Sequence, residues 1–372
     1  MKKIILFTIA LLLLSPLGAK DLKVLLDSRK TLEEFTFLEN YAIVINKDHY
    51  YGPISKNNPL KIEIADGGKM RLWLKYIEKD KNNKDQYKYK NLGTTASQVD
   101  IVRGFENGVD FSKTIDPKNP VSKTIDSKYV SLSKQAKKST PFLKYKIKGL
   151  SGWIEFTGPI SFNVRPQSKD SFFLVETIPL EKYLVHVTNC EMRIAHNIEA
   201  YKAQSILART FALKKIQERL DKNNKNRTNW LNFQLLPDER DQAYVCEMRV
   251  KNDTLPDQSI KDAVKSTQNL VLGKNNALVE IHYCAYCGNC SYCSTTNHCK
   301  TKNGMGSCQN GIAYYSHQKG YTYEKLLKKY HPDAKIYTYN EKDGHLAYSP
   351  LELQNELENN LSEAEKRLKQ MI

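Results

Sequence analysis

The sequence predicts an α+β fold in which strands pack around one long helix, with a smaller β-rich region before it and an amphipathic helix after it. Short apolar stretches alternate with polar ones up to about residue 178, which is typical of strands. Apolar residues then recur every three or four positions between Ile198 and Leu220, which indicates a helix with one buried stripe. With 372 residues, the chain is long enough for two domains, or for one domain with an elaborate extension.

Residues 1–19 have the pattern of a secretory signal peptide. Lys2 and Lys3 precede the apolar run from Ile4 to Leu14, and small residues before Lys20 suit cleavage. We therefore expect an exported protein of the periplasm or cell envelope, with no transmembrane span once the signal is removed. An uncleaved N-terminal anchor is the alternative.

The composition is basic, with 57 Lys and Arg against 41 Asp and Glu and a formal net charge of +16. Such a charge favours anionic partners. For an exported protein these are cell-wall polymers or membrane surfaces, and export argues against nucleic acid. A solvated, Lys-rich surface without a dedicated partner is the alternative.

The region 20–141 is predicted to be β-rich, with strands at 41–46, 60–64 and 70–74. The charged, Asn-rich stretch 79–90 indicates a loop, and 116–140 indicates a basic linker. The main domain is expected at 142–340. We expect its strands at 153–156, 160–164, 172–178, 270–272 and 277–283, and its helices at 179–184, about 198–220 and 260–267.

The segment 341–372 predicts a C-terminal helix. Ser349 suits the N-cap, Pro350 suits the first helical position, and leucines follow at helical spacing from Leu353. We expect this helix to dock on the main domain, with pairing to a partner as the alternative.

Six ordered blocks carry a family resemblance: 178–184, Glu191-Met192, 199–212, 241–244, 263–272 and 320–332. In sequence they include IPLEKYL, EAYKAQ with ARTFA, DQAY, and GYTYEKLL with YHP. Together the blocks resemble the SpoIID/LytB family, meaning stage II sporulation protein D and the amidase enhancer LytB. The resemblance implies action on peptidoglycan, either as a lytic transglycosylase on glycan strands stripped of peptides or as an enhancer of a cell-wall amidase. It maps the catalytic glutamate onto Glu191 and the helix arginine onto Arg209.

A single carboxylate suits this chemistry. A lytic transglycosylase protonates the glycosidic oxygen, and the muramyl 6-hydroxyl of the substrate then attacks to close a 1,6-anhydro ring. Ordinary glycosidases need two carboxylates because their nucleophile does not belong to the substrate. Partial burial beside Met192 is expected to favour the protonated acid. The competing interpretation is a carboxylate placed at a helix start by the helix dipole.

Six further residues are candidates for substrate binding. Arg209 is assigned to substrate carboxylate or sugar oxygens, or else to structure, because direct contact with Glu191 would oppose protonation. Lys202 and Gln204 are candidates to face the substrate, with a solvated helix position as the alternative for Lys202. The others are Gln242 in the DQAY block, and Tyr244 and Tyr283, which are candidates for stacking on sugar rings or else core aromatics.

Two departures from the family keep a second function open. The family's Gly-His-Gly-Val-Gly-Met-Ser-Gln block survives only as NGMGSCQ, with Asn303 in place of the His, and a Gly-Gly pair becomes Gly288-Asn289. If that His shapes the active site, two alternatives are open: a weak or altered enzyme, or a non-catalytic wall-binding or amidase-enhancing protein.

The chain has eight cysteines, an even number that suits disulfides in an exported protein. A bridge between Cys190 and Cys246 would tie Glu191 to the DQAY block. The C-x-x-C spacing from residue 284 to 293 also suits a structural zinc, and an iron–sulfur cluster is disfavoured by the spacing. The zinc candidates are Cys284, Cys287, Cys290, Cys293, His298 and Cys299. The predicted reaction itself requires no cofactor.

Overall fold

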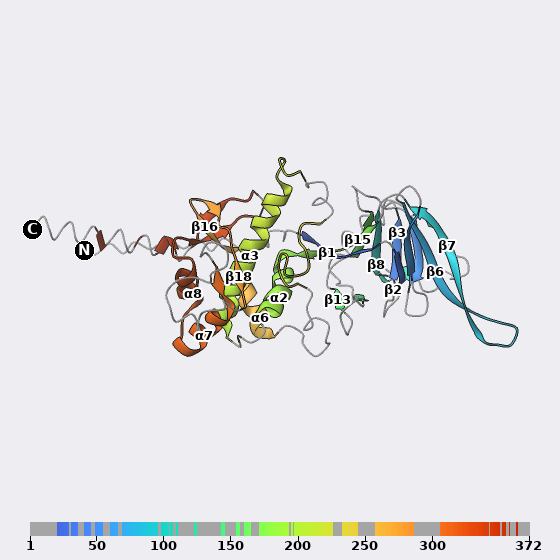
Figure 1. Ribbon diagram of the computed structural model, residues 1–372, viewed down its shortest axis with the longest axis horizontal. Helices are drawn as coiled ribbons and strands as arrows, with labels where there is room; N and C mark the ends of the chain where they lie inside the picture. Colours follow the sequence, from blue (N-terminus) through green and yellow to red (C-terminus); the bar gives the residue numbers. More distant parts are fainter. Residues whose placement is uncertain are drawn as a thin grey trace, which may run out of the picture.

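The computed structural model describes most residues of 171–225, 233–244, 257–285 and 306–349. It also describes the strands between residues 21 and 164, the hairpin turn at 80–84, and a few helical residues between 352 and 363. The protein combines helices with mostly antiparallel sheets, which agrees with the predicted α+β class. Figure 1 shows the helices gathered around α3 (Ile198–Leu220) at one end and the N-terminal strands at the other.

A seven-stranded sheet joins the two parts of the chain. Its order is β1-β15-β14-β8-β3-β4-β11, and all its described pairs are antiparallel. β1 and β8 come from the N-terminal region, whereas β14 and β15 come from the main domain. The boundary predicted at residue 142 therefore runs through one sheet. The strands are β1 (Asp21–Arg29), β3 (Tyr41–Ile45), β4 (His49–Ile54), β8 (Gln98–Arg103), β11 (Lys123–Thr124), β14 (Ile160–Val164) and β15 (Phe172–Pro179).

A four-stranded sheet has the order β2-β5-β6-β7, with β2 (Thr31–Phe35), β5 (Leu60–Ala65), β6 (Lys69–Lys79) and β7 (Asp85–Thr95). The loop predicted at 79–90 is wrong, because β6 and β7 form a long hairpin there. Asp80 Oδ1 accepts hydrogen bonds from the backbone N–H groups of Asn82 and Lys84, and Asn83 has φ 62°. These short-range contacts make a tight turn of a sequence whose composition suggested a loop.

Three helices surround the region of Glu191. α3 has the bounds that its apolar spacing predicted, and it begins where Asn197 accepts hydrogen bonds from the N–H groups of Glu199 and Ala200. α2 (Leu180–Glu191) is longer than predicted and reaches Glu191 itself. α6 (Gln258–Ser266) also packs on α3.

The C-terminal part closes around α3. A sheet of order β17-β16-β20-β21 contains β16 (Leu270–Lys274), β17 (Ala277–Leu278), β20 (Lys335–Tyr339) and β21 (Leu346–Tyr348). β18 (Tyr283–Cys284) pairs in parallel with β19 (Ser307–Cys308), which leads into α7 (Gln309–Lys319) and α8 (Tyr323–Tyr330). Two small pairs complete the described strands: β9 (Phe105–Glu106) with β10 (Val109–Asp110), and β12 (Leu143–Tyr145) with β13 (Ile154–Phe156).

The start of the predicted C-terminal helix has the expected cap, since Glu352 N–H donates to Ser349 Oγ at 3.3 Å. The expectation that its leucines dock on the main domain is wrong for the two that are described. Leu353 is 55% exposed and Leu357 is 61% exposed. Within the described part of the chain, no helix is both long and apolar enough to cross a bilayer.

Candidate active site

Glu191 is the last residue of α2 and is half-buried. The helix continues to this point because a buried stripe runs through Tyr183, Leu184 and Val187. The alternative of a carboxylate favoured at a helix start is therefore wrong. The partial charge at a helix C-terminus is negative, so the dipole of α2 does not favour a carboxylate at Glu191. Other groups must hold it.

Two neutral donors from distant parts of the chain hold this carboxylate. The backbone N–H of Ala243 donates to Glu191 Oε1 at 2.7 Å, and Gln309 Nε2 donates to Oε2 at 3.0 Å. Gln309 is buried at the start of α7. A carboxylate has about four lone-pair sites, so these two bonds orient both oxygens and leave each with a further site for a proton.

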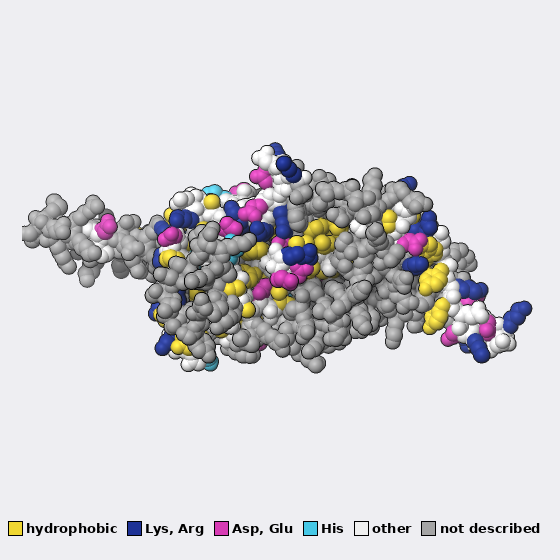
Figure 2. All heavy atoms as spheres, in the orientation of Figure 1, with side chains coloured by type: hydrophobic (Ala, Val, Ile, Leu, Met, Phe, Trp, Pro, Cys, Tyr) yellow, Lys and Arg dark blue, Asp and Glu magenta, His cyan; other side chains and the backbone are white. Residues whose placement is uncertain are grey.

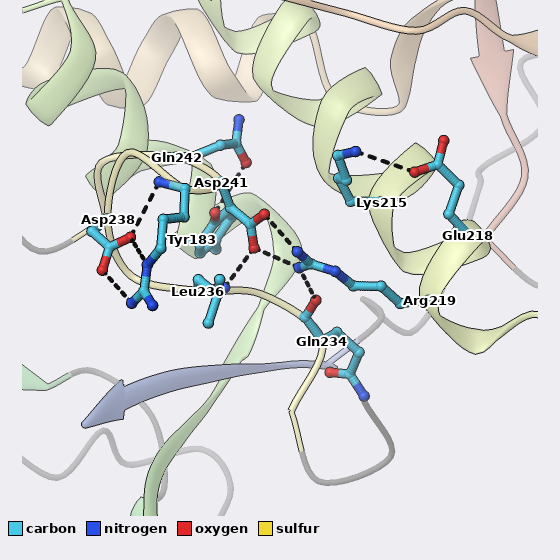
Figure 3. A network of polar contacts seen from close by, with 10 residues as sticks. Tyr183, Lys215, Glu218, Arg219, Gln234, Leu236, Asp238, Asp241 and Gln242 are labelled. Atoms are coloured by element: carbon cyan, nitrogen blue, oxygen red, sulfur yellow. Dashed lines mark hydrogen bonds and ion pairs between the residues drawn. The ribbon is translucent and has the colours of Figure 1, made fainter. Parts of the chain in front are cut away.

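An ion pair fixes the turn that presents Ala243 (Figure 3). Arg219 on α3 donates through two nitrogens to the carboxylate of Asp241, which also accepts the N–H of Leu236 at 2.7 Å. Asp241 has a fully buried side chain. Such a bidentate pair is geometrically specific. It therefore sets the position of the backbone N–H that faces Glu191, two residues further on.

Gln242 is fully buried, and its side-chain amide makes hydrogen bonds to other residues of the protein. Its Nε2 donates to the carbonyl of Ala208 at 3.1 Å and to the hydroxyl of Tyr283 at 2.7 Å, while its Oε1 accepts from Tyr183 at 3.0 Å. Both N–H groups of the amide are used in this way. The predicted contact of Gln242 with substrate is therefore corrected to a positioning role beneath the site.

The two candidate tyrosines differ in their surroundings. Tyr244 is fully buried, stacks on Tyr183 at 4.9 Å and donates its hydroxyl to Glu176 at 2.7 Å. The stacking role on sugar predicted for Tyr244 is wrong, since it is a core aromatic. Tyr283 is only part-buried. Burial, and after it the negative charge of Glu191, raise the pKa of Tyr283 well above its usual range. Its hydroxyl therefore stays protonated near Glu191.

Arg209 is fully buried and is engaged away from Glu191. Its Nε and Nη2 donate to the two oxygens of Glu181 at 2.8 and 2.6 Å, and its Nη1 donates to the carbonyl of Leu270 at 3.0 Å. This arrangement supports the structural alternative and not contact with substrate. Lys202 is half-buried and pairs with Glu199 at 2.7 Å, as expected of a surface helix residue.

Gln204 stands apart from these candidates. It is fully buried on α3, and neither its Nε2 nor its Oε1 has a hydrogen-bond partner within the described structure. Buried polar atoms in proteins nearly always have partners, and each exception calls for an explanation. On the helical spacing of α3, Gln204 shares a face with Ala208, whose carbonyl binds Gln242. The amide is enclosed by the protein, and the structure does not bring Gln204 to a surface that substrate could touch.

Residues 168–273 match the model of the SpoIID family, described as Stage II sporulation protein. The chain carries a SpoIID-family domain. The match spans Glu191, all of α2 and α3, and the 241–244 segment, and it confirms the predicted resemblance to SpoIID. It indicates a sporulation- or cell-wall-related protein. No curated protein is significantly similar to the chain.

The two hydrogen-bond donors to Glu191, Ala243 in the SpoIID domain and Gln309 beyond it, were not predicted from the sequence. The N–H of Ala243 leaves no trace in sequence, because any residue except proline carries one. Gln309 could have been found, since it is the final residue of the block whose His is replaced by Asn303. That block keeps its glutamine although its His is replaced.

The structure describes only part of the cysteine set. Cys190, next to Glu191, is disulfide-bonded, and its Sγ lies 3.8 Å from the carbonyl oxygen of Tyr244. Its predicted partner Cys246 lies outside the described residues. Cys284 and Cys308 are neighbours in the β18–β19 register. The remaining zinc candidates, Cys287, Cys290, Cys293, His298 and Cys299, also lie outside the described residues, so a disulfide or a zinc among these candidates stays a prediction.

Proposed function

We propose that this protein is an exported lytic transglycosylase that cleaves peptidoglycan glycan strands and uses Glu191 as its single acid and base. The observation that carries the proposal is the half-buried Glu191 of the SpoIID domain, held by two neutral N–H donors. Arg209 is paired with Glu181, and among the described residues it makes no ion pair with Glu191.

The reaction balances with one carboxyl group. Glu191 gives its proton to the glycosidic oxygen as the bond from that oxygen to the anomeric carbon breaks. The muramyl 6-hydroxyl attacks the same carbon, and its proton passes to the Glu191 carboxylate. A 1,6-anhydro ring forms, the acid is regenerated, and no water or cofactor is consumed.

The donors to Glu191 suit the step in which it is a carboxylate. Once the proton has left, the N–H groups of Ala243 and Gln309 stabilise the carboxylate without having to reorganise. The remaining lone-pair site on each oxygen can then take up the second proton. Tyr283, protonated beside Glu191, can donate to a sugar oxygen while it accepts from Gln242.

The test is a digest of peptide-free glycan strands by the wild-type protein and by Glu191→Gln. We expect 1,6-anhydro-muramyl ends from the wild type, about 10²–10⁴-fold fewer from the variant, and normal cleavage by the control Glu239→Gln, which alters an exposed glutamate. The amide of Gln309 can rotate to accept from the new side chain, so the fold should survive. Equal product from Glu191→Gln would refute the assignment.

A non-catalytic wall-binding or amidase-enhancing protein is the second candidate, favoured by Asn303 at the position of the family's His. It predicts no anhydro ends from the wild type. It also predicts that a cell-wall amidase is stimulated equally by the wild type and by Glu191→Gln.

A further inference from the structure

The outward face of the β2-β5-β6-β7 sheet carries aromatic side chains. Leu60, Ile62, Met70 and Leu72 alternate along β5 and β6 and are fully buried, so the residues between them point to the other face. Trp73 on β6 lies on this other face, together with Tyr87 and Tyr89 on β7. Tyr87 is 62% exposed and Tyr89 is 49% exposed. We call this face the Trp73 face.

Cations lie among these rings. Lys61 Nζ is 5.0 Å from the centroid of the Trp73 ring and 6.0 Å from that of Tyr89, and the guanidinium carbon of Arg71 is 5.7 Å from Trp73. Lys61 and Arg71 share one carboxylate, Glu63, at 3.6 Å from each. Two cations and one anion leave the centre of the Trp73 face positive.

The rest of the hairpin extends this charge. Residues 69–95 contain eight Lys and Arg against three Asp and Glu. β6 and β7 reach well beyond the neighbouring strands (Figure 1), and Figure 2 shows exposed apolar side chains along the hairpin with dark blue basic side chains toward its tip. Asp80 orders that tip through its bonds to Asn82 and Lys84. The hairpin is therefore an ordered, basic projection at the end of the molecule remote from α3.

We propose that the Trp73 face binds an anionic polysaccharide, namely a glycan strand with unsubstituted muramyl carboxylates; the choice of this glycan rests on the proposed function. The C–H faces of sugar rings can pack on Tyr87 and Tyr89, while Lys61 and Arg71 attract carboxylates. Tyrosine suits this role because it offers a rigid apolar face together with a hydroxyl.

A second contact on the same polymer has a kinetic consequence. A strand held at the hairpin presents its other sugars to the SpoIID domain at a raised effective concentration, provided that it is long enough to span both sites. The Trp73 face would thus direct the enzyme to long strands with their peptides removed, whose carboxylates are exposed.

The test is a co-sedimentation isotherm with insoluble peptide-free glycan, in a Glu191→Gln background so that nothing is cut. We expect Tyr87→Ala/Tyr89→Ala to weaken binding about tenfold, because each lost ring contact costs a few fold. Tyr87→Phe/Tyr89→Phe keeps the rings and should bind nearly as the parent does. Lys61→Ala should weaken binding and reduce its salt dependence, whereas Lys222→Ala, an exposed lysine after α3, should do neither.

Equal binding by the Tyr→Ala pair and its parent, with matching circular dichroism, would overturn the proposal. So would stronger retention on vesicles containing anionic phospholipid than on glycan, since that would make the face a membrane contact. The outcome is independent of catalysis. If wild-type protein makes no anhydro ends but the Tyr→Ala pair loses glycan binding, the proposed reaction fails and the Trp73 face stands.

Discussion

Replacing Arg209 separates a structural role from a substrate-binding role. In Arg209→Met the Glu181 carboxylate loses both of its hydrogen bonds, and the carbonyl of Leu270 loses a donor at 3.0 Å. Arg209 has no exposed side chain and Glu181 keeps 18% exposure, so little water can replace the pair. Leaving one member of a buried pair alone costs about 3–5 kcal/mol. We expect a loss of that size in the free energy of unfolding.

The second variant removes both charges. In Arg209→Met/Glu181→Leu no unpaired carboxylate remains, and we expect about 2–3 kcal/mol to be regained, with the lost donor to the carbonyl of Leu270 accounting for the rest. Urea unfolding measures both variants, and a double-mutant cycle isolates the coupling.

The activity of the double variant decides between the two roles. If Arg209 acts only through the fold, the refolded double variant regains most of its glycan cleavage, with a KM near that of wild type. A stable double variant with KM raised tenfold or more would show that Arg209 touches substrate, and our reasoning would be refuted.

Three further predictions concern Gln309, Gln204 and His331. Gln309→Ala removes one donor to Glu191 and should lower kcat about 10²-fold with little change in KM; an equal loss in Gln258→Ala, on the exposed side of α6, would point to a general defect. Gln204→Leu should raise the free energy of unfolding by about 1 kcal/mol, because an unpaired buried amide is removed; a less stable variant would show that the amide has partners. Burial, and after it His282, lower the pKa of His331 from 6.5 to about 4. Between pH 6.5 and 4, His331 is therefore protonated in the unfolded chain but neutral in the folded protein. The free energy of unfolding should fall by about 3 kcal/mol as the pH drops from 6.5 to 4. His331→Gln should flatten that slope in pH-dependent unfolding, and an unchanged slope would assign it to other groups.

The elements with strong local signals were predictable from the sequence. The bounds of α3 followed from apolar residues every three or four positions, and the SpoIID resemblance rested on ordered blocks within that same region. The hairpin of β6 and β7 was missed because its turn depends on the side chain of Asp80, whereas the composition of the stretch is that of a loop. The end of α2 at Glu191 was missed because its last two turns are stabilised by burial against α3.

The site residues were harder to predict because tertiary contacts decide their roles. Arg209 and Gln242 lie in sequence blocks that resemble the SpoIID family. The hydrogen-bonding groups of each are nevertheless paired with residues 28 to 61 positions away along the chain. Gln309 lies 118 residues from Glu191, and no local pattern links the two. A sequence motif locates the residues of the site, but which of them remains available to substrate depends on which hydrogen bonds the fold has already made.

The central claim is that Glu191 works alone because the substrate supplies the nucleophile. The most direct test is to digest peptide-free glycan in water enriched in ¹⁸O and to weigh the new ends by mass spectrometry. The mechanism predicts ends one water lighter than hydrolysis products and without label, made by the wild type and not by Glu191→Gln. New reducing ends that carry ¹⁸O would show that water is the nucleophile, and would contradict the single-carboxylate mechanism.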